Sequence, residues 1–392
     1  MKNVLFLINS FGDLEWISPI VKECQKNNLS VHIFFFTTNY KNILSTSKYL
    51  DKNLKDVKKT DIINLFFSAK FLENIIRNIT KISLLDRAIK RCLVFFLDIF
   101  SDYFSIKLMK TLSPNFLFHD ISKDTSLRNS LKNKVIANKG DVIVHPHGSE
   151  VFVEMIPDFI DPLPNFLLSA NEITAASYSQ NYPNAKIFIS GIPKLNETWI
   201  PRKNRNKDIK RKKILFIARG PHHQDLSISN YEKIVEGLFL EIKKNNNLEL
   251  IIKPHPRYGS KDLVKRLKYH KIKNWKIFEG SLAEISENID LAVSMWSTLI
   301  IDCILLNIPA IEYFIYENNS NRWMRENNMP ISGYKKYNLA QHISKHGELK
   351  TYFEMNSQEL KEINSLSKAN LKKICNICYN LEVIDHLTKN FD

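Results

Sequence analysis

The densest group of residues able to do chemistry is Lys253-Pro254-His255-Pro256-Arg257, in the second half of the chain. It follows a continuous apolar run with the length of a buried strand, so we expect it at a strand's carboxyl end. Two prolines restrict the backbone of this turn, and three of its side chains carry or acquire positive charge. Such a turn is suited to binding an anionic phosphate, although a surface turn with a capping histidine has the same composition.

A second group, Ser294-Met295-Trp296-Ser297-Thr298, joins an expected strand to a helix that we expect to begin near Ser297. The N–H groups and the dipole at a helix amino terminus bind phosphate, and hydroxyl groups add donors. An ordinary Ser/Thr N-cap has the same sequence. Two such turns at adjacent strand ends of one sheet would converge on one crevice, and together they predict a phosphate site.

The first half contains a third group, His145-Pro146-His147-Gly148-Ser149. A histidine near its ordinary pKa acts as a general base at neutral pH, and the following glycine lets a ligand approach closely. His147 is therefore the candidate base, with a hydrogen-bonded structural histidine as the alternative. A His-x-His pair needs further ligands to hold a metal, and we predict no metal site.

Weaker signals come from single residues near other expected strand ends. Gly12, after the first apolar run, leaves room for a ligand, and the 191–194 segment has the composition of a turn. Glu150 and Glu279 are candidates to orient a histidine or bind ribose. The chain has no Gly-x-Gly-x-x-Gly, P-loop or Gly-x-Ser-x-Gly pattern, which argues against those phosphate-binding and hydrolase classes.

To bring these residues together, each group must directly follow the carboxyl end of a strand. Short apolar runs, each followed by a polar or Gly/Pro element, alternate with segments of helical periodicity in both halves of the chain. We expect strands at 3–8, 31–37, 115–120, 141–148, 173–177, 186–193, 213–218, 248–256, 275–280, 289–294 and 308–314. This alternation indicates parallel sheets with crossover helices, which bind ligands outside the strands' carboxyl ends.

The basic segment 201–213 divides the chain. It holds eight basic residues and one acidic residue, and we interpret it as an exposed linker. The boundaries are therefore a first domain at 1–200, the linker at 201–213, a second domain at 214–355 and a helical tail at 356–392.

Composition excludes several classes. Hydrophobic residues are 44% and charged residues 25%, which excludes a disordered chain, a collagen and a coiled coil. No apolar run reaches the ~18 residues of a spanning helix, and the first residues do not resemble a signal peptide. Five cysteines favour a reducing cytoplasm. The lone Cys375-x-x-Cys378 lacks the second pair that zinc needs, and we interpret it as packing.

The net charge of +15 at pH 7 attracts polyanions such as nucleic acid, anionic lipid or phosphorylated substrates. The segment 85–109 mixes Lys and Arg with Phe, Leu and Ile. This composition is typical of a helix that lies on an anionic membrane, and also of a buried helix pair, which we favour.

Taken in order, four turns resemble those of one group of enzymes. These are His-Gly at 147–148, Gly-x-Pro-Lys at 191–194, Lys-Pro-His-Pro at 253–256 and the Ser-rich turn at 294–298, followed by Asp-x-x-x-Leu-x-Ile-Pro. They resemble bacterial transferases that build capsules and wall teichoic acids, including CDP-glycerol glycerophosphotransferases and related capsule-polysaccharide, Kdo and sialic acid transferases. The likeness covers about 141–315 and is strongest at 249–256 and 290–313.

The match is incomplete at several positions. Ser294, Ser297, Thr298 and Asp302 fit the glycerophosphotransferase pattern, whereas Asn307 replaces its glycine. Met-Trp also replaces its Asp-Tyr, and Gly-Ser-Glu at 148–150 replaces its Gly-Thr-Pro. These departures fit the wider fold and nucleotide site better than one particular donor.

The resemblance implies a GT-B fold, which is two Rossmann-like, doubly wound α/β domains facing a cleft. It implies an acceptor in the first domain and a nucleotide in the second. We expect a metal-independent and cofactor-free transferase of surface-polysaccharide biosynthesis. It would move a glycosyl or polyol-phosphate group from a CMP- or CDP-linked donor to a glycan or lipid-linked acceptor.

In this interpretation His255 and Lys253 neutralise the leaving phosphate and Ser297 and Thr298 bind it, while His147 deprotonates the acceptor hydroxyl. The enzyme would be cytoplasmic, with an anionic membrane surface as a further partner and no nucleic acid. Three alternatives stay open: a UDP-sugar glycosyltransferase, an enzyme like UDP-GlcNAc 2-epimerase, and a non-enzymatic polyanion-binding protein. The epimerase's Gly-Thr-Arg-Pro-Glu and His-x-Glu-x-Gly patterns are not found.

Overall fold

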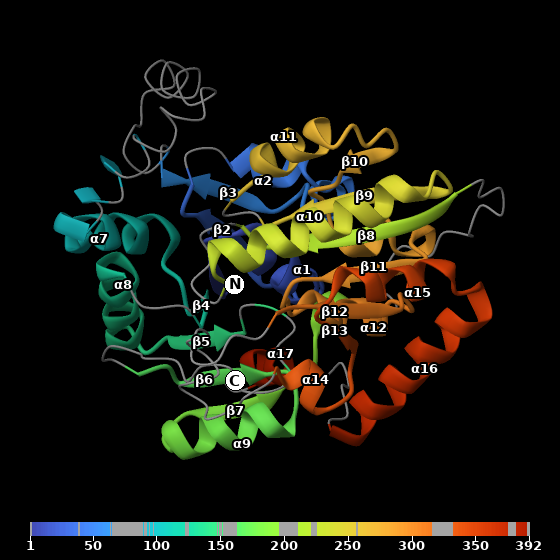
Figure 1. The fold of residues 1–392 in the computed structure, drawn as a ribbon. Coiled ribbons are helices and arrows are strands. Elements are labelled where there is room, and N and C mark those ends of the chain that lie inside the picture. Colours follow the sequence, from blue (N-terminus) through green and yellow to red (C-terminus); the bar gives the residue numbers. More distant parts are fainter. Residues whose placement is uncertain are drawn as a thin grey trace. The chain divides into compact units, whose positions relative to one another are not determined.

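The chain folds into two compact units, shown in a computed structural model (Figure 1). The structure describes residues 2–37, 40–62, 64, 89, 92–93, 95–96, 98–121, 125–146, 148, 151, 163–195, 211–220, 226–255, 258–315, 332–374 and 382–389. Unit 1 comprises Met1–Gly148, Ile156–Asn196 and Ile377–Asp392. Unit 2 comprises Ser149–Met155 and Glu197–Asn376.

Unit 1 is built on a seven-stranded parallel sheet in the order β3-β2-β1-β4-β5-β6-β7. The strands are β1 (Asn3–Ile8), β2 (Ser30–Phe35), β3 (Lys58–Asp61), β4 (Phe116–Asp120), β5 (Asp141–His145), β6 (Phe166–Ser169) and β7 (Lys186–Ile189). Helices cover such a sheet on both faces, so its central strands are continuous apolar runs. In β1, every residue from Val4 to Ile8 is buried.

The helices of unit 1 are α1 (Phe11–Lys26), α2 (Tyr40–Ser45), α3 (Lys48–Asn53), α7 (Ser101–Leu112), α8 (Ser126–Ala137), α9 (Glu172–Asn181), the short 3₁₀ helix η1 (Pro193–Leu195) and α17 (Glu382–Lys389). Helix α17 comes from the far end of the sequence and contacts α1. Its Val383, Ile384 and Leu387 are buried, and Lys2 Nζ donates to the carbonyl of Leu387 at 3.1 Å. Residues separated by most of the sequence therefore complete one core.

Unit 2 has a six-stranded parallel sheet in the order β10-β9-β8-β11-β12-β13. The strands are β8 (Lys212–Ala218), β9 (Leu248–Pro254), β10 (Trp275–Ile277), β11 (Leu291–Ser294), β12 (Ala310–Tyr313) and β13 (Gln341–Ile343). The helices are α10 (Ile228–Lys244), α11 (Lys261–Tyr269), η2 (Leu282–Glu284), η3 (Ser286–Asn288), α12 (Leu299–Leu305), α14 (Gly333–Lys336), η4 (His346–Glu348), α15 (Leu349–Glu354) and α16 (Ser357–Ile374). One apolar cluster joins the sheet to α10, α11 and α15.

The two doubly wound α/β sheets confirm the predicted fold class, but individual elements differ from prediction. The segment 173–177, expected as a strand, lies inside α9. Asn171 explains this, because its Oδ1 accepts from Thr174 N at 3.0 Å and caps the helix. The true strand there is β6, and β3 and β13 were not predicted either.

The domain boundaries also differ in detail. Lys212 and Lys213, assigned to the linker, already belong to β8, while 201–210 lie outside the described residues. The expected tail at 356–392 is divided, since Ser357–Ile374 belongs to unit 2 and Glu382–Lys389 to unit 1.

Candidate functional site

Each sheet has a switch point, where the connections leaving two adjacent strands run in opposite directions along the sheet. In unit 2 this point lies between β8 and β11, and in unit 1 between β1 and β4. Ligands of such sheets bind at the carboxyl ends of the strands near this point. The groups that follow β8, β9 and β11 are thus the first candidates in unit 2.

Strand β9 ends in the predicted Lys-Pro-His turn. The carbonyl of His255 accepts from Tyr258 N and Gly259 N, both at 3.0 Å, and Gly259 has a φ of +67°, which favours glycine. The His255 ring is half-buried and lies 5.5 Å, centroid to centroid, from the Tyr258 ring. The backbone bonds therefore close the turn, and the His255 ring packs beside Tyr258.

Lys253 fixes the loop that follows β10. Its Nζ donates to the carbonyl of Gly280 and lies 5.4 Å from the centroid of the Phe278 ring. Glu279, between these two residues, is exposed. The structure thus gives Lys253 a positioning role, and its contact with phosphate and that of Glu279 with ribose stay predictions.

Strand β11 ends at Ser294, which is fully buried. No atom of the described part of the chain forms a hydrogen bond with its Oγ. Ser297 Oγ accepts from Leu299 N at 3.3 Å, and Thr298 is the N-cap of α12 without a side-chain capping bond. The three predicted hydroxyl residues therefore lie within five positions of one strand-to-helix turn.

Arg219 connects the two strand ends at the switch point. It follows β8, and its Nε donates to the carbonyl of Trp296, after β11, at 2.6 Å. Trp296 has a φ of +48°, an uncommon conformation for a residue with a side chain. Arg219 was not predicted as a site residue, although an Arg-Gly pair directly after a predicted strand carries the same signal as the turns that were.

Gly220 lies against the Tyr258 ring. A Cβ built on Gly220 would lie 2.1 Å from Cγ of Tyr258, so no larger residue fits unless that ring moves. The turns after β8 and β9 are therefore packed together at this glycine.

We expect Gly220→Ala to lower the free energy of unfolding by about 1–3 kcal/mol, because the added methyl group overpacks this contact. Denaturant unfolding of the purified variant measures the change. Gly12→Ala is the matched control, since the nearest atom to its added Cβ is Ser10 Oγ at 3.7 Å. Equal stability of the two variants would contradict the packing described here.

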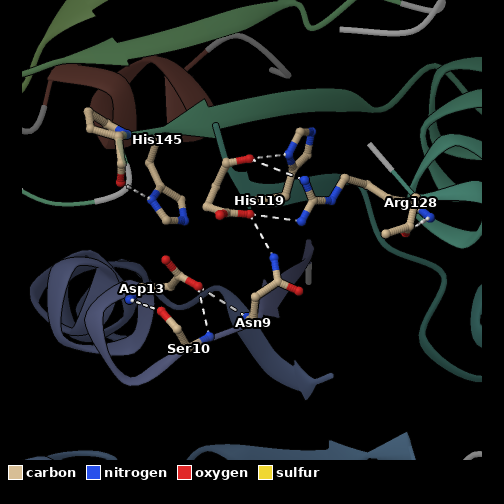
Figure 2. A network of polar contacts seen from close by, with 9 residues as sticks. Asn9, Ser10, Asp13, His119, Arg128 and His145 are labelled. Carbon is tan, nitrogen blue, oxygen red and sulfur yellow. Dashed lines mark hydrogen bonds and ion pairs between the residues drawn. The ribbon is translucent and has the colours of Figure 1, made fainter. Parts of the chain in front are cut away.

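In unit 1, the switch point holds a buried polar network (Figure 2). Asp120, the last residue of β4, accepts from Asn9 Nδ2 and from Arg128 Nη2, both at 2.8 Å. The side chains of Asp120 and Arg128 are each 1% exposed. This charge-assisted pair fixes the end of β4 against α8 and against the loop after β1.

Two histidines lie in the same region, at the ends of β4 and β5 (Figure 2). His119 Nδ1 is 2.8 Å from the carbonyl of Asp120, and His145 Nδ1 is 2.9 Å from that of Pro146. The His145 ring stacks on Trp16 with centroids 5.1 Å apart. Burial, followed by the charge of Arg128, holds the pKa of His119 well below its ordinary value, so its ring is neutral.

The first turn of α1 faces this network (Figure 2) and contains Gly12. Asp13 Oδ2 accepts from Ser10 N at 2.8 Å, while Ser10 Oγ accepts from Asp13 N at 3.3 Å, which forms a capping box. In the predicted turn at 191–194, buried Lys194 lies 3.7 Å from Glu15. These contacts join α1 to η1.

Several predicted residues cannot be placed. His147 and Glu150 lie outside the described residues, as do Cys375 and Cys378. Within the described ranges there is no group of three or more His, Cys, Asp or Glu side chains arranged to hold a metal. Those ranges also contain no helix that is long and apolar enough to cross a membrane.

Comparisons with known proteins support the fold. No protein-family model matches the sequence, and no curated protein matches it. Among solved structures, S. aureus MnaA with UDP is 11% identical, with a TM-score of 0.59, over 99% of this chain and 95% of that chain. The Methanocaldococcus jannaschii UDP-GlcNAc 2-epimerase with UDP-GlcNAc and UDP is 17% identical, with a TM-score of 0.55, over 99% of both chains.

A UGT transferase from Siraitia grosvenorii in complex with UDP is 10% identical, with a TM-score of 0.52, over 99% of both chains. At these identities the likeness concerns the fold alone, and it confirms the expected GT-B type with two Rossmann-like domains. None of these comparisons supports the narrower resemblance to CDP-glycerol glycerophosphotransferases.

Proposed function

We propose that this protein is a nucleotide-sugar enzyme that binds a UDP-sugar at the carboxyl edge of the unit 2 sheet. The observation that carries the proposal is that three neighbouring strands end at the switch point or directly beside it. Arg219 follows β8, His255 follows β9, and Ser294 ends β11. Phosphate groups bind where cations and hydroxyl donors gather at such a point.

The chemistry of the edge fits a diphosphate. The Arg219 guanidinium carries positive charge, and the half-buried His255 acquires it on protonation. The hydroxyl groups of Ser294, Ser297 and Thr298 are hydrogen-bond donors. Donors held in place before the reaction stabilise the charge that develops on a departing nucleoside diphosphate.

Uridine is the proposed nucleoside because the structural neighbours named above carry UDP or UDP-GlcNAc. This replaces the CMP- or CDP-linked donor expected from the sequence, which none of the neighbours named above supports. The acceptor would be a glycan or lipid-linked molecule bound by unit 1, with His147 as the base that deprotonates its hydroxyl.

A second candidate activity is epimerisation, favoured by the TM-scores of 0.55 to 0.59 to UDP-GlcNAc 2-epimerases. The two activities differ in their need for an acceptor. An epimerase changes the sugar of UDP-GlcNAc alone, whereas a transferase releases UDP only when an acceptor hydroxyl is present.

Thermal unfolding with nucleotides at about 1 mM tests the proposal, because a ligand at 100 times its Kd adds about 2.7 kcal/mol to the free energy of unfolding. We expect UDP to raise Tm, CMP and CDP to have less effect, and Ser294→Ala to reduce the UDP shift. A rise in Tm with CDP alone would contradict the uridine proposal and favour a cytidine-linked donor. Stabilisation by duplex DNA alone, lost at high salt, would mean that the positive charge serves polyanion binding.

A further inference from the structure

Unit 1 exposes a row of large apolar side chains within and just before α7. We call this row the aromatic face. Its members and their exposed fractions are Phe95 (61%), Phe96 (45%), Ile99 (55%), Phe100 (50%), Tyr103 (62%) and Ile106 (43%). Single exposed apolar residues are common on protein surfaces, but a contiguous group marks an interaction surface.

The spacing of these residues is helical, since steps of three and four positions place them on one side. Residues of the opposite side, Phe104 and Leu108 with Leu93, are buried in the core of unit 1. Helix α7 packs beside α8 (Figure 1). Among the described residues, the core therefore accounts for one side of this segment only, whereas the buried helix pair expected from the sequence would cover both sides.

Two lysines of α7 lie beside the aromatic face and supply positive charge that an anionic partner would meet. Helix α7 carries Lys107 and Lys110, with Asp102 as its one carboxylate. Asp102 accepts from Ser130 Oγ at 2.6 Å and from Lys134 Nζ at 3.3 Å, and these bonds lower its pKa. Asp98 is a second exposed carboxylate nearby, but the whole chain has a net charge of +15.

We propose that the aromatic face docks on an anionic lipid bilayer, with α7 lying in the plane of the membrane surface. Aromatic and branched apolar side chains enter the boundary between headgroups and acyl chains, while flanking lysines contact anionic headgroups. Side chains exposed by 43–62% stand out from the surface, which suits a fluid layer better than a rigid protein partner. None of the helices that the structure describes is long and apolar enough to cross a membrane.

Vesicle flotation of the full-length chain tests the proposal and does not depend on the donor nucleotide. We compare vesicles of pure phosphatidylcholine with vesicles that contain about 30 mol % phosphatidylglycerol, at low salt and at about 0.5 M NaCl. The test variant is Phe95→Ser/Phe100→Ser. The matched control is Tyr269→Ser/Leu366→Ser, which removes two apolar residues of unit 2 that are 81% and 53% exposed.

We expect the parent and the control to float with the anionic vesicles, and the test variant to partition about ten-fold or more less. Lys107→Gln/Lys110→Gln should weaken binding at low salt and remove most of its salt dependence. Circular dichroism must show the same Tm for test and control. Equal flotation of test and control, or no flotation of the parent, would overturn the proposal. So would a parent that forms dimers which the test variant abolishes, because the face would then bind a second copy.

Discussion

Replacing His255 by alanine is expected to lower kcat/KM for UDP-sugar turnover by about 100- to 1000-fold, the usual effect of losing one charge-stabilising donor. The same change removes the ring contact between His255 and Tyr258 and should lower Tm by only about 2–4 °C. The structural reason is that the turn is closed by the His255 carbonyl, which accepts from Tyr258 N and Gly259 N, and alanine keeps that carbonyl.

The change in kcat/KM is measured as UDP release from a UDP-sugar, with and without an acceptor. The change in Tm is measured by thermal unfolding. His270→Asn is the control. His270 follows α11 at the opposite edge of the same sheet and contacts Glu236, so its loss affects stability and not turnover. A His255→Ala variant that loses activity and stability to the same degree would make His255 a structural residue.

Arg128→Met should have the largest effect on stability, lowering the free energy of unfolding by about 3–5 kcal/mol. Arg128 and Asp120 are almost fully buried, and methionine fills similar space without a charge. The variant removes the guanidinium from the buried Asp120 carboxylate, while the bond from Asn9 Nδ2 to that carboxylate stays (Figure 2). An uncompensated buried charge is costly because the protein interior screens it poorly.

Denaturant unfolding of the single variant and of Asp120→Asn/Arg128→Met measures this effect. The double variant removes both charges and should recover much of the lost stability. Lys134→Met is the control, because it breaks an ion pair with Asp102, a side chain that is 81% exposed, and should cost less than about 1 kcal/mol. A double variant less stable than Arg128→Met would show that the pair is not the source of the loss.

Local sequence signals predicted the interior strands of both sheets except β6. Strand β1 was predicted residue by residue, because the apolar run 3–8 ends just before Ser10, which caps α1. The edge strands β3 and β13 were missed because edge strands need few apolar residues. Their sequences, KKTD and QHI, have none of the continuous apolar runs that mark central strands. The apolar run 173–177 favoured a strand, but the segment is helical because Asn171 caps the start of α9.

For the candidate site, too, the residues that local sequence marks were predicted, and the contacts between distant residues were not. His255, Ser294, Ser297 and Thr298 were predicted because strand ends are visible in the sequence. The link from Arg219 to Trp296 and the bond from Lys253 to Gly280 join residues 77 and 27 positions apart. No local pattern announces such contacts, because they depend on which strands become neighbours. The buried Asp120–Arg128 pair belongs to this class as well.

Helix α17 has a consequence for how the protein is made. Synthesis proceeds from the amino end, and domains generally fold as they emerge from the ribosome. Unit 1 cannot complete its folding in this way. The apolar residues of α17, which packs against α1, are translated only after all of the described residues of unit 2. During that interval the surface of α1 that α17 covers stays open to chaperones and to other nascent chains. A premature stop codon after α16 would therefore damage the unit encoded first.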